Sequence, residues 1–414
     1  MNVKVIAMIG LLIVLFHFSS MAIHEEMENV NLFDESVRRT LYVGGSGPGN
    51  YSKIQDAIDN ASDRDTVFVY EGIYYENIVI NRSINLIGEN AKTTIIDGME
   101  KGNVIYVCGN RVCISNFTIQ HGGGAWPGAG IFIYSSDNVI SNNIIRNNGK
   151  GIILVDLVSK RNKVYKNTVV SNAETGIDIF NAEKNIIKEN NVLHNGGDGI
   201  EIADAGSNTI EKNVLADTIY LGRAYGNIVK DNSFSEGGIR IWHSFGNKLL
   251  NNTIKGEPIV YLEDKRDLEI DKGAQVILVR CEGITIKNLN ISNTCCAIHL
   301  SFCNGCTVEE NVLENNSFGI EMYSCKRNLL KRNTLKNNEC GILLEMHSNM
   351  NKIFDNNFVE NNVHAIFSIS FYNLWLRNYW DNWKLPLPKP VFGFIYGFPW
   401  LNFDWMPRSS PQSH

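Results

Sequence analysis

Apolar and polar residues alternate in short runs along most of the chain, and the runs repeat at a nearly constant distance. Each run opens on glycine and isoleucine, followed by one variable residue and a second apolar residue. These openings stand at Gly130, Gly151, Gly176, Gly199, Gly238, Gly319 and Gly341. Alternation with a period of two predicts short β-strands. Most neighbouring openings lie about twenty to twenty-five residues apart, a period typical of stacked repeats.

Asparagines recur in steps of five residues between these strands. Complete sets of three begin at Asn138, Asn162, Asn185, Asn328 and Asn351. Asparagine tolerates a left-handed backbone and bonds locally, so we expect it at the corners between strands. Coils stacked about 4.8 Å apart would let each asparagine bond to the one above and below. The pattern predicts an all-β, right-handed parallel β-helix solenoid with three short strands per coil. The leucine-asparagine consensus and alternating helices of a leucine-rich repeat are missing.

Both ends of the predicted β-helix, residues 41–375, differ from the repeat. Residues 52–61 place Ile54, Ala57, Ile58 and Ala61 on one face of a short helix, with Ser52 as its N-cap. This helix would cover the open end of the first coil. Residues 256–274 are charged and depart from the asparagine pattern, which indicates a junction between two groups of coils.

The C-terminal segment, residues 376–414, is predicted to form a cap and tail. The stretch from residue 372 to 407 breaks the repeat and holds five of the seven tryptophans. Two interpretations are open, a hydrophobic plug over the last coil or an aromatic platform for sugar rings. A solenoid requires a cap, so we predict an aromatic-rich C-terminal cap.

The first 22 residues have the pattern of a signal peptide, with Lys4, an apolar run from Val5 to Phe16 and a small-x-small site ending at Ala22. The alternative is an uncleaved anchor, but the apolar run is shorter than the roughly 20 residues that span a bilayer. We therefore expect a secreted or cell-surface protein with no membrane span after signal removal. A net charge of -6 and the lack of a long basic run argue against a nucleic-acid partner. The oligomeric state stays open.

Several early motifs are similar to the first coils of pectin-lyase-like β-helix proteins. They are Tyr51-Ser-Lys-Ile-Gln-Asp-Ala-Ile, Asp65-Thr-Val-Phe-Val, Gly72-Ile-Tyr-Tyr-Glu and Ile84-Asn-Leu-Ile-Gly. With the asparagine repeats, residues 41–380 resemble the NosD-like periplasmic copper-binding family and the carbohydrate-binding and sugar hydrolase (CASH) domains. The resemblance implies the fold, because its motifs are structural. The catalytic signature of pectin methylesterases is missing.

The variable residue of each opening points outward if the flanking isoleucines point inward. The predicted ligand-binding strip joins these residues to aromatic residues of the next outward column: Asp178, Glu201, Tyr220, Arg240, His299 and Glu321, with Trp242 and Tyr323. Acids, an arginine and aromatic rings suit a polysaccharide groove. Asp178 and Glu201 on neighbouring coils would hold their carboxyls about 5 Å apart, near the spacing of retaining glycosidases, which makes them candidate catalytic residues. The alternative is a solvated, mixed-charge outer face.

Three cysteines, Cys281, Cys303 and Cys325, are spaced by 22 residues, and His347 takes the next position in that register. These four residues are candidates for a copper or zinc site. Disulfides between stacked positions and a ladder of small buried residues are the alternatives. We predict no cofactor.

The function predicted from these observations is binding of a carbohydrate or cell-surface polymer without turnover. A polysaccharide hydrolase or lyase acting through outer-face carboxylates is the first alternative, and an accessory copper-binding role of the NosD type is the second. The predicted partner is a polysaccharide or cell-surface glycan.

Overall fold

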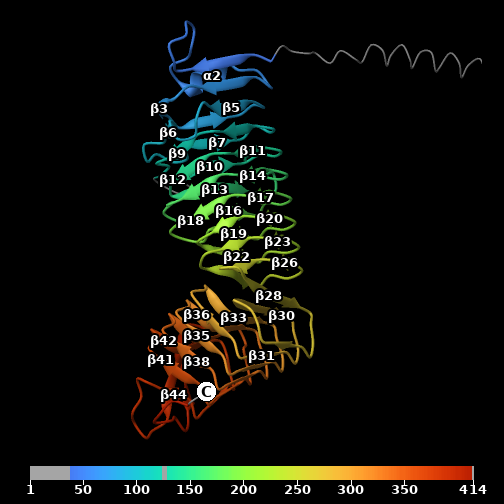
Figure 1. The fold of residues 1–414 in the computed structure, drawn as a ribbon, viewed down its shortest axis with the longest axis vertical. Coiled ribbons are helices and arrows are strands. Elements are labelled where there is room, and N and C mark those ends of the chain that lie inside the picture. The colour runs from blue at the N-terminus through green and yellow to red at the C-terminus, as the bar shows by residue number, and fades with distance from the viewer. Residues whose placement is uncertain (1–37, 124–127, 413–414) are drawn as a thin grey trace, which may run out of the picture. The chain divides into compact units, whose positions relative to one another are not determined.

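The computed structural model describes residues 38–123 and 128–412, and the predicted signal peptide lies outside the described residues. From Thr40 onward the described chain consists of short strands, with one helix near its start. Successive strands wind into coils that stack in chain order (Figure 1). No helix in the described ranges is both long and apolar enough to cross a bilayer.

The first coil block contains the strands up to residue 254, arranged in three sheets of parallel strands. The first sheet holds β1 (Thr40–Val43), β2 (Thr66–Val69), β5 (Asn85–Gly88), β8 (Cys113–Ser115), β11 (Val139–Ser141), β14 (Lys163–Tyr165), β17 (Ile186–Lys188), β20 (Thr209–Glu211), β23 (Ile228–Lys230) and β26 (Lys248–Leu250). The second holds β4 (Ile78–Ile80), β7 (Ile105–Val107), β10 (Ala129–Ile133), β13 (Lys150–Val155), β16 (Ile177–Phe180), β19 (Ile200–Ala203), β22 (Thr218–Gly222) and β25 (Gly238–Trp242). The third holds β3 (Gly72–Tyr75), β6 (Thr94–Asp97), β9 (Thr118–Gln120), β12 (Ile144–Arg146), β15 (Thr168–Val170), β18 (Asn191–Leu193), β21 (Val214–Leu215), β24 (Ser233–Phe234) and β27 (Thr253–Ile254).

The second coil block, from residue 257 to 404, repeats this arrangement with three further runs of parallel pairing. One run holds β28 (Glu257–Glu263), β30 (Gln275–Val279), β33 (Cys296–Ser301), β36 (Phe318–Tyr323), β39 (Cys340–Glu345), β42 (Val363–Ser368) and β45 (Lys389–Ile395). Another holds β29 (Glu269–Ile270), β31 (Thr285–Lys287), β34 (Thr307–Glu309), β37 (Leu329–Lys331), β40 (Lys352–Phe354), β43 (Leu374–Leu376) and β46 (Phe398–Asp404). The third holds β32 (Asn290–Ser292), β35 (Val312–Glu314), β38 (Thr334–Lys336), β41 (Asn357–Val359) and β44 (Tyr379–Trp380).

The helix α2 (Ile54–Asn60) covers the first coil with Ile54, Ala57 and Ile58, all buried as the spacing predicted. The predicted N-cap is wrong, because Lys53 occupies the cap position and makes no side-chain cap bond. The carboxylate of Glu76 accepts instead from the backbone N–H groups of Ile54 and Gln55, at 2.8 and 3.0 Å. An acid from the link between β3 and β4 thus satisfies the first free donors of the helix.

Asparagine ladders line the corners, as the repeat predicted. Within a ladder, the side-chain oxygen of one asparagine accepts from both the backbone N–H and the side-chain NH₂ of the asparagine one coil earlier, as Asn190 does for Asn167 at 3.0 Å. The expected left-handed backbone belongs to the preceding residue, such as Lys166 (φ 56°) before Asn167 and Glu189 (φ 54°) before Asn190. The reason is that the asparagine side chain turns inward to the ladder, so the residue before it makes the corner.

The two coil blocks meet at a break in the strand pairing. β27 and β28 form an antiparallel hairpin, and parallel pairing resumes from β28 to β30. Every residue of β30 is buried: Val276 and Leu278 face the second core, whereas Ile277 and Val279 join the first. The Gln275 side chain accepts from Ile239 N–H at 3.0 Å and donates to the Ile239 and Cys296 carbonyls at 2.8 Å. This amide bridges the free edge of β25 to β33.

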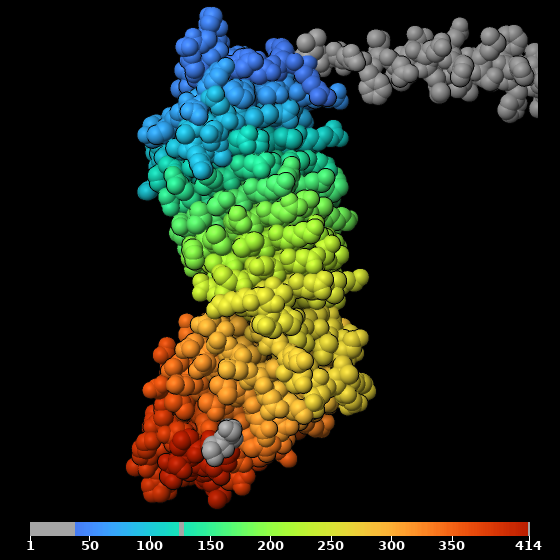
Figure 2. Space-filling view, viewed as in Figure 1, coloured from blue at the N-terminus to red at the C-terminus, as the bar shows by residue number. Residues whose placement is uncertain are grey.

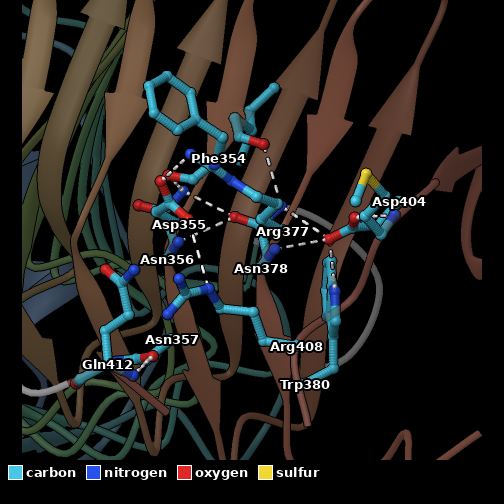
Figure 3. Close-up of polar contacts among 12 residues, drawn as sticks. Phe354, Asp355, Asn356, Asn357, Arg377, Asn378, Trp380, Asp404, Arg408 and Gln412 are labelled. Carbon is cyan, nitrogen blue, oxygen red and sulfur yellow. Dashed lines mark hydrogen bonds and ion pairs between the residues drawn. The ribbon is translucent and has the colours of Figure 1, made fainter. Parts of the chain in front are cut away.

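The last coil is closed by aromatic residues and by one buried acid. Trp380 stacks on Phe358 with ring centroids 4.2 Å apart, and Trp375 is fully buried beside it. Asp404 ends an asparagine ladder, accepting from the Asn378 backbone and side chain and from the Trp380 indole at 2.9 to 3.0 Å (Figure 3). Where the C-terminal segment meets the last coil, these residues therefore form a hydrophobic plug.

Candidate functional site

A hollow of about 340 Å³ lies on the outer face of the second sheet of the first coil block. The sheet supplies it because the parallel register stacks Asp178 beside Glu201 and Glu201 beside Tyr220 on adjacent strands. The residues that line it are Lys150, Ile153, Val155, Asp178, Phe180, Glu201, Ala203, Tyr220, Gly222, Arg223 and Trp242. Four of the predicted ligand-binding residues, Asp178, Glu201, Tyr220 and Trp242, therefore share one site.

A buried ion pair forms one end of the hollow. Lys150 Nζ lies 2.5 Å from Asp178 Oδ2, and both side chains are mostly covered. Burial opposes the charge of Lys150, but Asp178 outweighs burial and raises the pKa of the ammonium group. Lys150 and Asp178 thus form a mostly covered ion pair at this end of the hollow.

The pKa values of two nearby carboxyls, Glu201 and Asp198, are raised. Burial, and then the Asp178 charge, raises the pKa of Glu201, whose Oε2 accepts from Thr175 Oγ1 at 3.3 Å. Burial together with Glu201 raises the pKa of Asp198 to about 6. The site thus places the ion-paired Asp178 next to Glu201, a carboxyl that holds its proton more tightly than usual, the combination from which acid and base roles are built. Asp198 interacts with Glu201 but does not line the hollow.

Aromatic rings form the walls of the hollow. Phe180 is exposed, Tyr220 and Trp242 are half-buried, and the Arg223 guanidinium lies 5.4 Å from the Trp242 ring centroid. Arg223 is itself fixed by a two-bond ion pair with Asp204. Flat rings beside charged, hydrogen-bonding groups offer both apolar and polar contacts to a ligand.

The other half of the predicted strip lies elsewhere. Arg240 Nη2 lies 2.8 Å from Glu321 Oε1, and Glu321 Oε2 lies 3.3 Å from His299 Nδ1. His299 and Glu321 are 1% and 3% exposed, and Tyr323 is also buried, so none of the three lies on an open outer strip. Burial alone would raise the pKa of Glu321, but its bonds to His299 and Arg240 hold it at about 2. The strip is divided because the second coil block packs against the end of the first.

One group of side chains in this corner has the chemistry of a metal site. Ligand atoms of Cys296, His299 and Glu321 lie within 4.8 Å of one another, and all three residues are buried. His299 Nε2 has no hydrogen-bond partner among the described residues. Burial raises the pKa of Cys296 well above its usual value, so a metal bound here would have to displace the thiol proton.

The predicted cysteine column is partly wrong in its register. Cys303 N–H donates to Cys325 Sγ, and Cys325 N–H donates to Ser348 Oγ. Ser348 therefore follows Cys325 in the column, and His347 is exposed with a left-handed backbone (φ 67°). The coil is one residue longer here, because Met346 and His347 both turn at the corner.

All nine cysteines are free thiols. Cys281, Cys303 and Cys325 are buried, and each donates its S–H to backbone carbonyls, as a packed ladder of small residues would. The bond from Cys303 lowers the pKa of Cys281 to about 7. This column forms no disulfide.

The sequence analysis missed Lys150 and Arg223, which line the hollow, and Asp198, which interacts with Glu201. Lys150 and Asp198 each stand directly before a Gly-Ile opening, and that position is a signal that could have identified them. Arg223 follows β22 with a left-handed backbone (φ 48°) and turns back over Trp242. No periodic pattern marks a corner residue of this kind.

A second hollow of about 530 Å³ lies where the two coil blocks meet, and its lining is mostly polar. It includes Asp217, Glu236, Thr294, Asn316 and Glu339. In the space-filling view the surface narrows where the yellow and orange segments, near residues 250 and 290, come together (Figure 2).

Two family models match the chain. One, described as "Right handed beta helix region", matches residues 76–254. The other, described as "Periplasmic copper-binding protein (NosD)", matches residues 217–384. None of the curated proteins compared with the chain matches it. The predicted right-handed β-helix and the resemblance to NosD-like proteins are confirmed for the residues matched.

Three solved structures to which the chain is similar share little sequence with it. Carrot pectin methylesterase is 15% identical with a TM-score of 0.40, covering 54% of this chain and 85% of its own. A mannuronan C-5 epimerase A-module from Azotobacter vinelandii is 15% identical with a TM-score of 0.40, covering 78% and 97%. The catalytic domain of a GH87 alpha-1,3-glucanase in complex with nigerose is 13% identical with a TM-score of 0.45, covering 80% and 66%.

Proposed function

Since this chain is a right-handed parallel β-helix protein, we propose that it binds an extended polysaccharide across the outer face of β13 to β25, without turnover. The observation that carries the proposal is the 340 Å³ hollow that Phe180, Tyr220 and Trp242 line together with the Lys150–Asp178 ion pair. A β-helix face is long and flat, so one chain of sugars can lie along several coils. We also propose that the protein is exported from the cytoplasm.

The aromatic residues supply the larger share of the binding energy. The faces of sugar rings are apolar and pack against aromatic rings, and aromatic side chains bury more area than other residue types. Charged groups around the rings fix the orientation of the ligand, because Lys150 and Arg223 can donate hydrogen bonds to it and Asp178 can accept them. Each of these groups is already held by a partner, so little side-chain freedom is lost on binding.

The test is titration of neutral and acidic polysaccharides into wild type and three variants. We expect Trp242→Ala and Phe180→Ala each to weaken binding about tenfold, since a buried aromatic contact contributes about 1.5 kcal/mol or more. The Phe180→Ala variant tests the hollow alone, whereas Trp242→Ala also removes a ring contact with Tyr323 at the junction between the two blocks. The matched control, Tyr75→Ala, removes a 62% exposed ring from β3 and should leave binding unchanged. Unchanged binding in both site variants would contradict the proposal.

Wild type and a Glu201→Gln variant test catalysis with the same polysaccharides. A raised pKa on Glu201 beside the Asp178 carboxylate would suit a general acid, which supports polysaccharide hydrolysis or lysis as the alternative. We expect neither reducing ends nor unsaturated products from any polymer that binds. Product that wild type releases and Glu201→Gln does not would make the protein an enzyme and overturn binding without turnover.

A second candidate function is binding of a soft metal ion in the corner between the coil blocks. Three observations favour it: the unpartnered Nε2 of His299, the nearby Cys296 and Glu321, and the match of residues 217–384 to a family described as copper-binding. Thiolate and imidazole ligands suit copper or zinc. Elemental analysis of protein incubated with copper and then desalted tests it. Stoichiometric copper that is lost in His299→Phe would support this site, and no retained metal would exclude it.

A further inference from the structure

The hairpin formed by β45 and β46 leaves the coil stack with an apolar tip. From Phe394 to Leu401 the chain carries no charged residue. The exposed side chains of this hairpin tip are Phe394 (46%), Tyr396 (71%), Phe398 (74%), Trp400 (54%) and Leu401 (43%). A patch of this composition on a water-exposed surface marks a site of interaction.

Both faces of the hairpin tip are apolar. Directly opposed residues of an antiparallel pair share a face, so the pairing of Phe394 with Pro399 and of Phe392 with Leu401 defines one face. The pairing of Gly393 with Trp400 and of Ile395 with Phe398 defines the other. A docked protein would cover one face of a hairpin, whereas a lipid phase surrounds both.

The charges around the hairpin are basic. Residues 381–412 contain Lys384, Lys389 and Arg408 and two acids. Asp381 Oδ1 lies 2.8 Å from His364 Nε2, and Asp404 is fully buried in the ladder end. Arg408 lies against Asp355 together with Arg377 (Figure 3). Lys384 and Lys389 form no ion pair with any described acid, and their ammonium groups lie 5.2 Å from the rings of Tyr379 and Trp383. Two lysines behind an aromatic tip suit anionic headgroups.

The base of the hairpin is rigid, which keeps the tip outside the coil stack. Phe367 pairs in register with Gly393, and a side chain at Gly393 would meet the Phe367 backbone oxygen at 2.4 Å from its Cβ. Trp375 pairs with Asp404 on the other strand. The arm from Phe394 to the turn at Gly397 extends about 10 Å, which matches the roughly 5–10 Å depth of the bilayer interface.

We propose that the hairpin tip inserts into the interface of an anionic lipid bilayer, with Lys384 and Lys389 against the headgroups. The tip attaches the β-helix to a membrane surface without spanning it. Aromatic side chains are favoured at this depth because one end is apolar and the other polar. The glycan-binding hollow and this tip are separate sites, so either can fail without the other.

The test mixes the full chain with vesicles of phosphatidylcholine alone or with phosphatidylglycerol, some brominated on the acyl chain. We expect co-sedimentation with the anionic vesicles and quenching of tryptophan fluorescence by the brominated lipid. Quenching that falls in a Trp400→Phe variant reports the tip, because Trp400 is the exposed tryptophan of the tip and Trp126, Trp242 and Trp405 remain in that variant. The double variant Tyr396→Ser/Phe398→Ser retains Trp400 and Trp405, and it should lower vesicle binding at least tenfold.

Two controls make the result decisive. Ile73→Ser with Tyr75→Ser removes two side chains of similar exposure, 54% and 62%, from β3 and should change nothing. Lys384→Gln with Lys389→Gln should weaken binding to anionic vesicles about fivefold per lysine. Three results would each overturn the proposal. The first is vesicle binding without tryptophan quenching, and the second is equal binding by wild type and the Tyr396→Ser/Phe398→Ser variant. The third is a wild-type dimer that becomes a monomer in this variant. Equal binding to neutral vesicles would overturn the part assigned to the lysines.

Discussion

The same repeat pattern gives opposite surroundings in the two coil blocks. In the first, the outward residues Asp178, Glu201 and Tyr220 lie around an open hollow. In the second, the outward residues Ile277, His299 and Glu321 stack in the same kind of register but are buried. The difference arises because the outer face of β30 and the end of the first block cover each other. Periodicity shows which way a side chain points from its coil, and packing between blocks decides what it meets.

The largest effect should come from separating the two blocks. Ile277→Asp places a carboxylate in the first core from the outer face of β30, and a buried unpaired charge with the loss of a full aliphatic side chain should cost about 4 kcal/mol. Denaturant unfolding measures this. The matched variant Ile73→Asp, at a 54% exposed position, should change stability by less than about 1 kcal/mol. Equal stability of the two variants would contradict the junction described above.

Loss of the Arg240–Glu321–His299 contacts should make stability depend less on pH. The pKa of Glu321 is lowered to about 2, so its stabilising contribution is complete above the unfolded value near 4.5 and is lost as pH falls toward 2. Glu321→Gln should therefore reduce the free energy of unfolding by about 3 kcal/mol at pH 7 and by much less at pH 2. Thermal unfolding from pH 2 to 7 measures the difference. A constant difference between the two proteins would rule out this ionisation as its source.

A smaller effect on stability, of opposite sign, is expected at Asp198, which interacts with Glu201 of the hollow. Asp198 has a pKa raised to about 6, so the folded state favours its protonated form. Its contribution is fully present below about 3.8 and is lost as pH rises through 6. Asp198→Asn should stabilise the protein by about 1 kcal/mol at pH 8, after allowance for partial solvent screening, with no gain at pH 4. Unfolding at these two pH values tests it, and a loss of stability at pH 8 would refute the raised pKa.

The sequence predicts the coil itself well because each coil repeats the same local physics. Alternating aliphatic residues bury one face of each strand, and asparagines such as Asn167 and Asn190 bond from coil to coil. The apolar spacing predicts the short N-terminal helix. It does not predict the cap, because the capping residue Glu76 lies 21 residues after Gln55, whose backbone N–H donates to it.

The candidate site follows from sequence only where it depends on register within one block. Asp178, Glu201 and Tyr220 could be placed together from their spacing alone. Arg223 could not, because it reaches the hollow from a corner, whereas Lys150 could have been found from its position directly before a Gly-Ile opening. The extra residue beside Met346 moves His347 out of the cysteine column, and a fixed spacing of 22 residues cannot anticipate such an insertion.

The central claim is that the hollow on the first block binds a glycan, and one titration tests it most directly. Ala203→Trp places a large side chain among the residues that line the hollow and removes none of the charged groups. If the account is right, a polysaccharide that binds wild type should lose most of its affinity for this variant, while the variant unfolds at the wild-type temperature. Undiminished binding by a folded Ala203→Trp protein, or no binding of any polysaccharide by wild type, would contradict it.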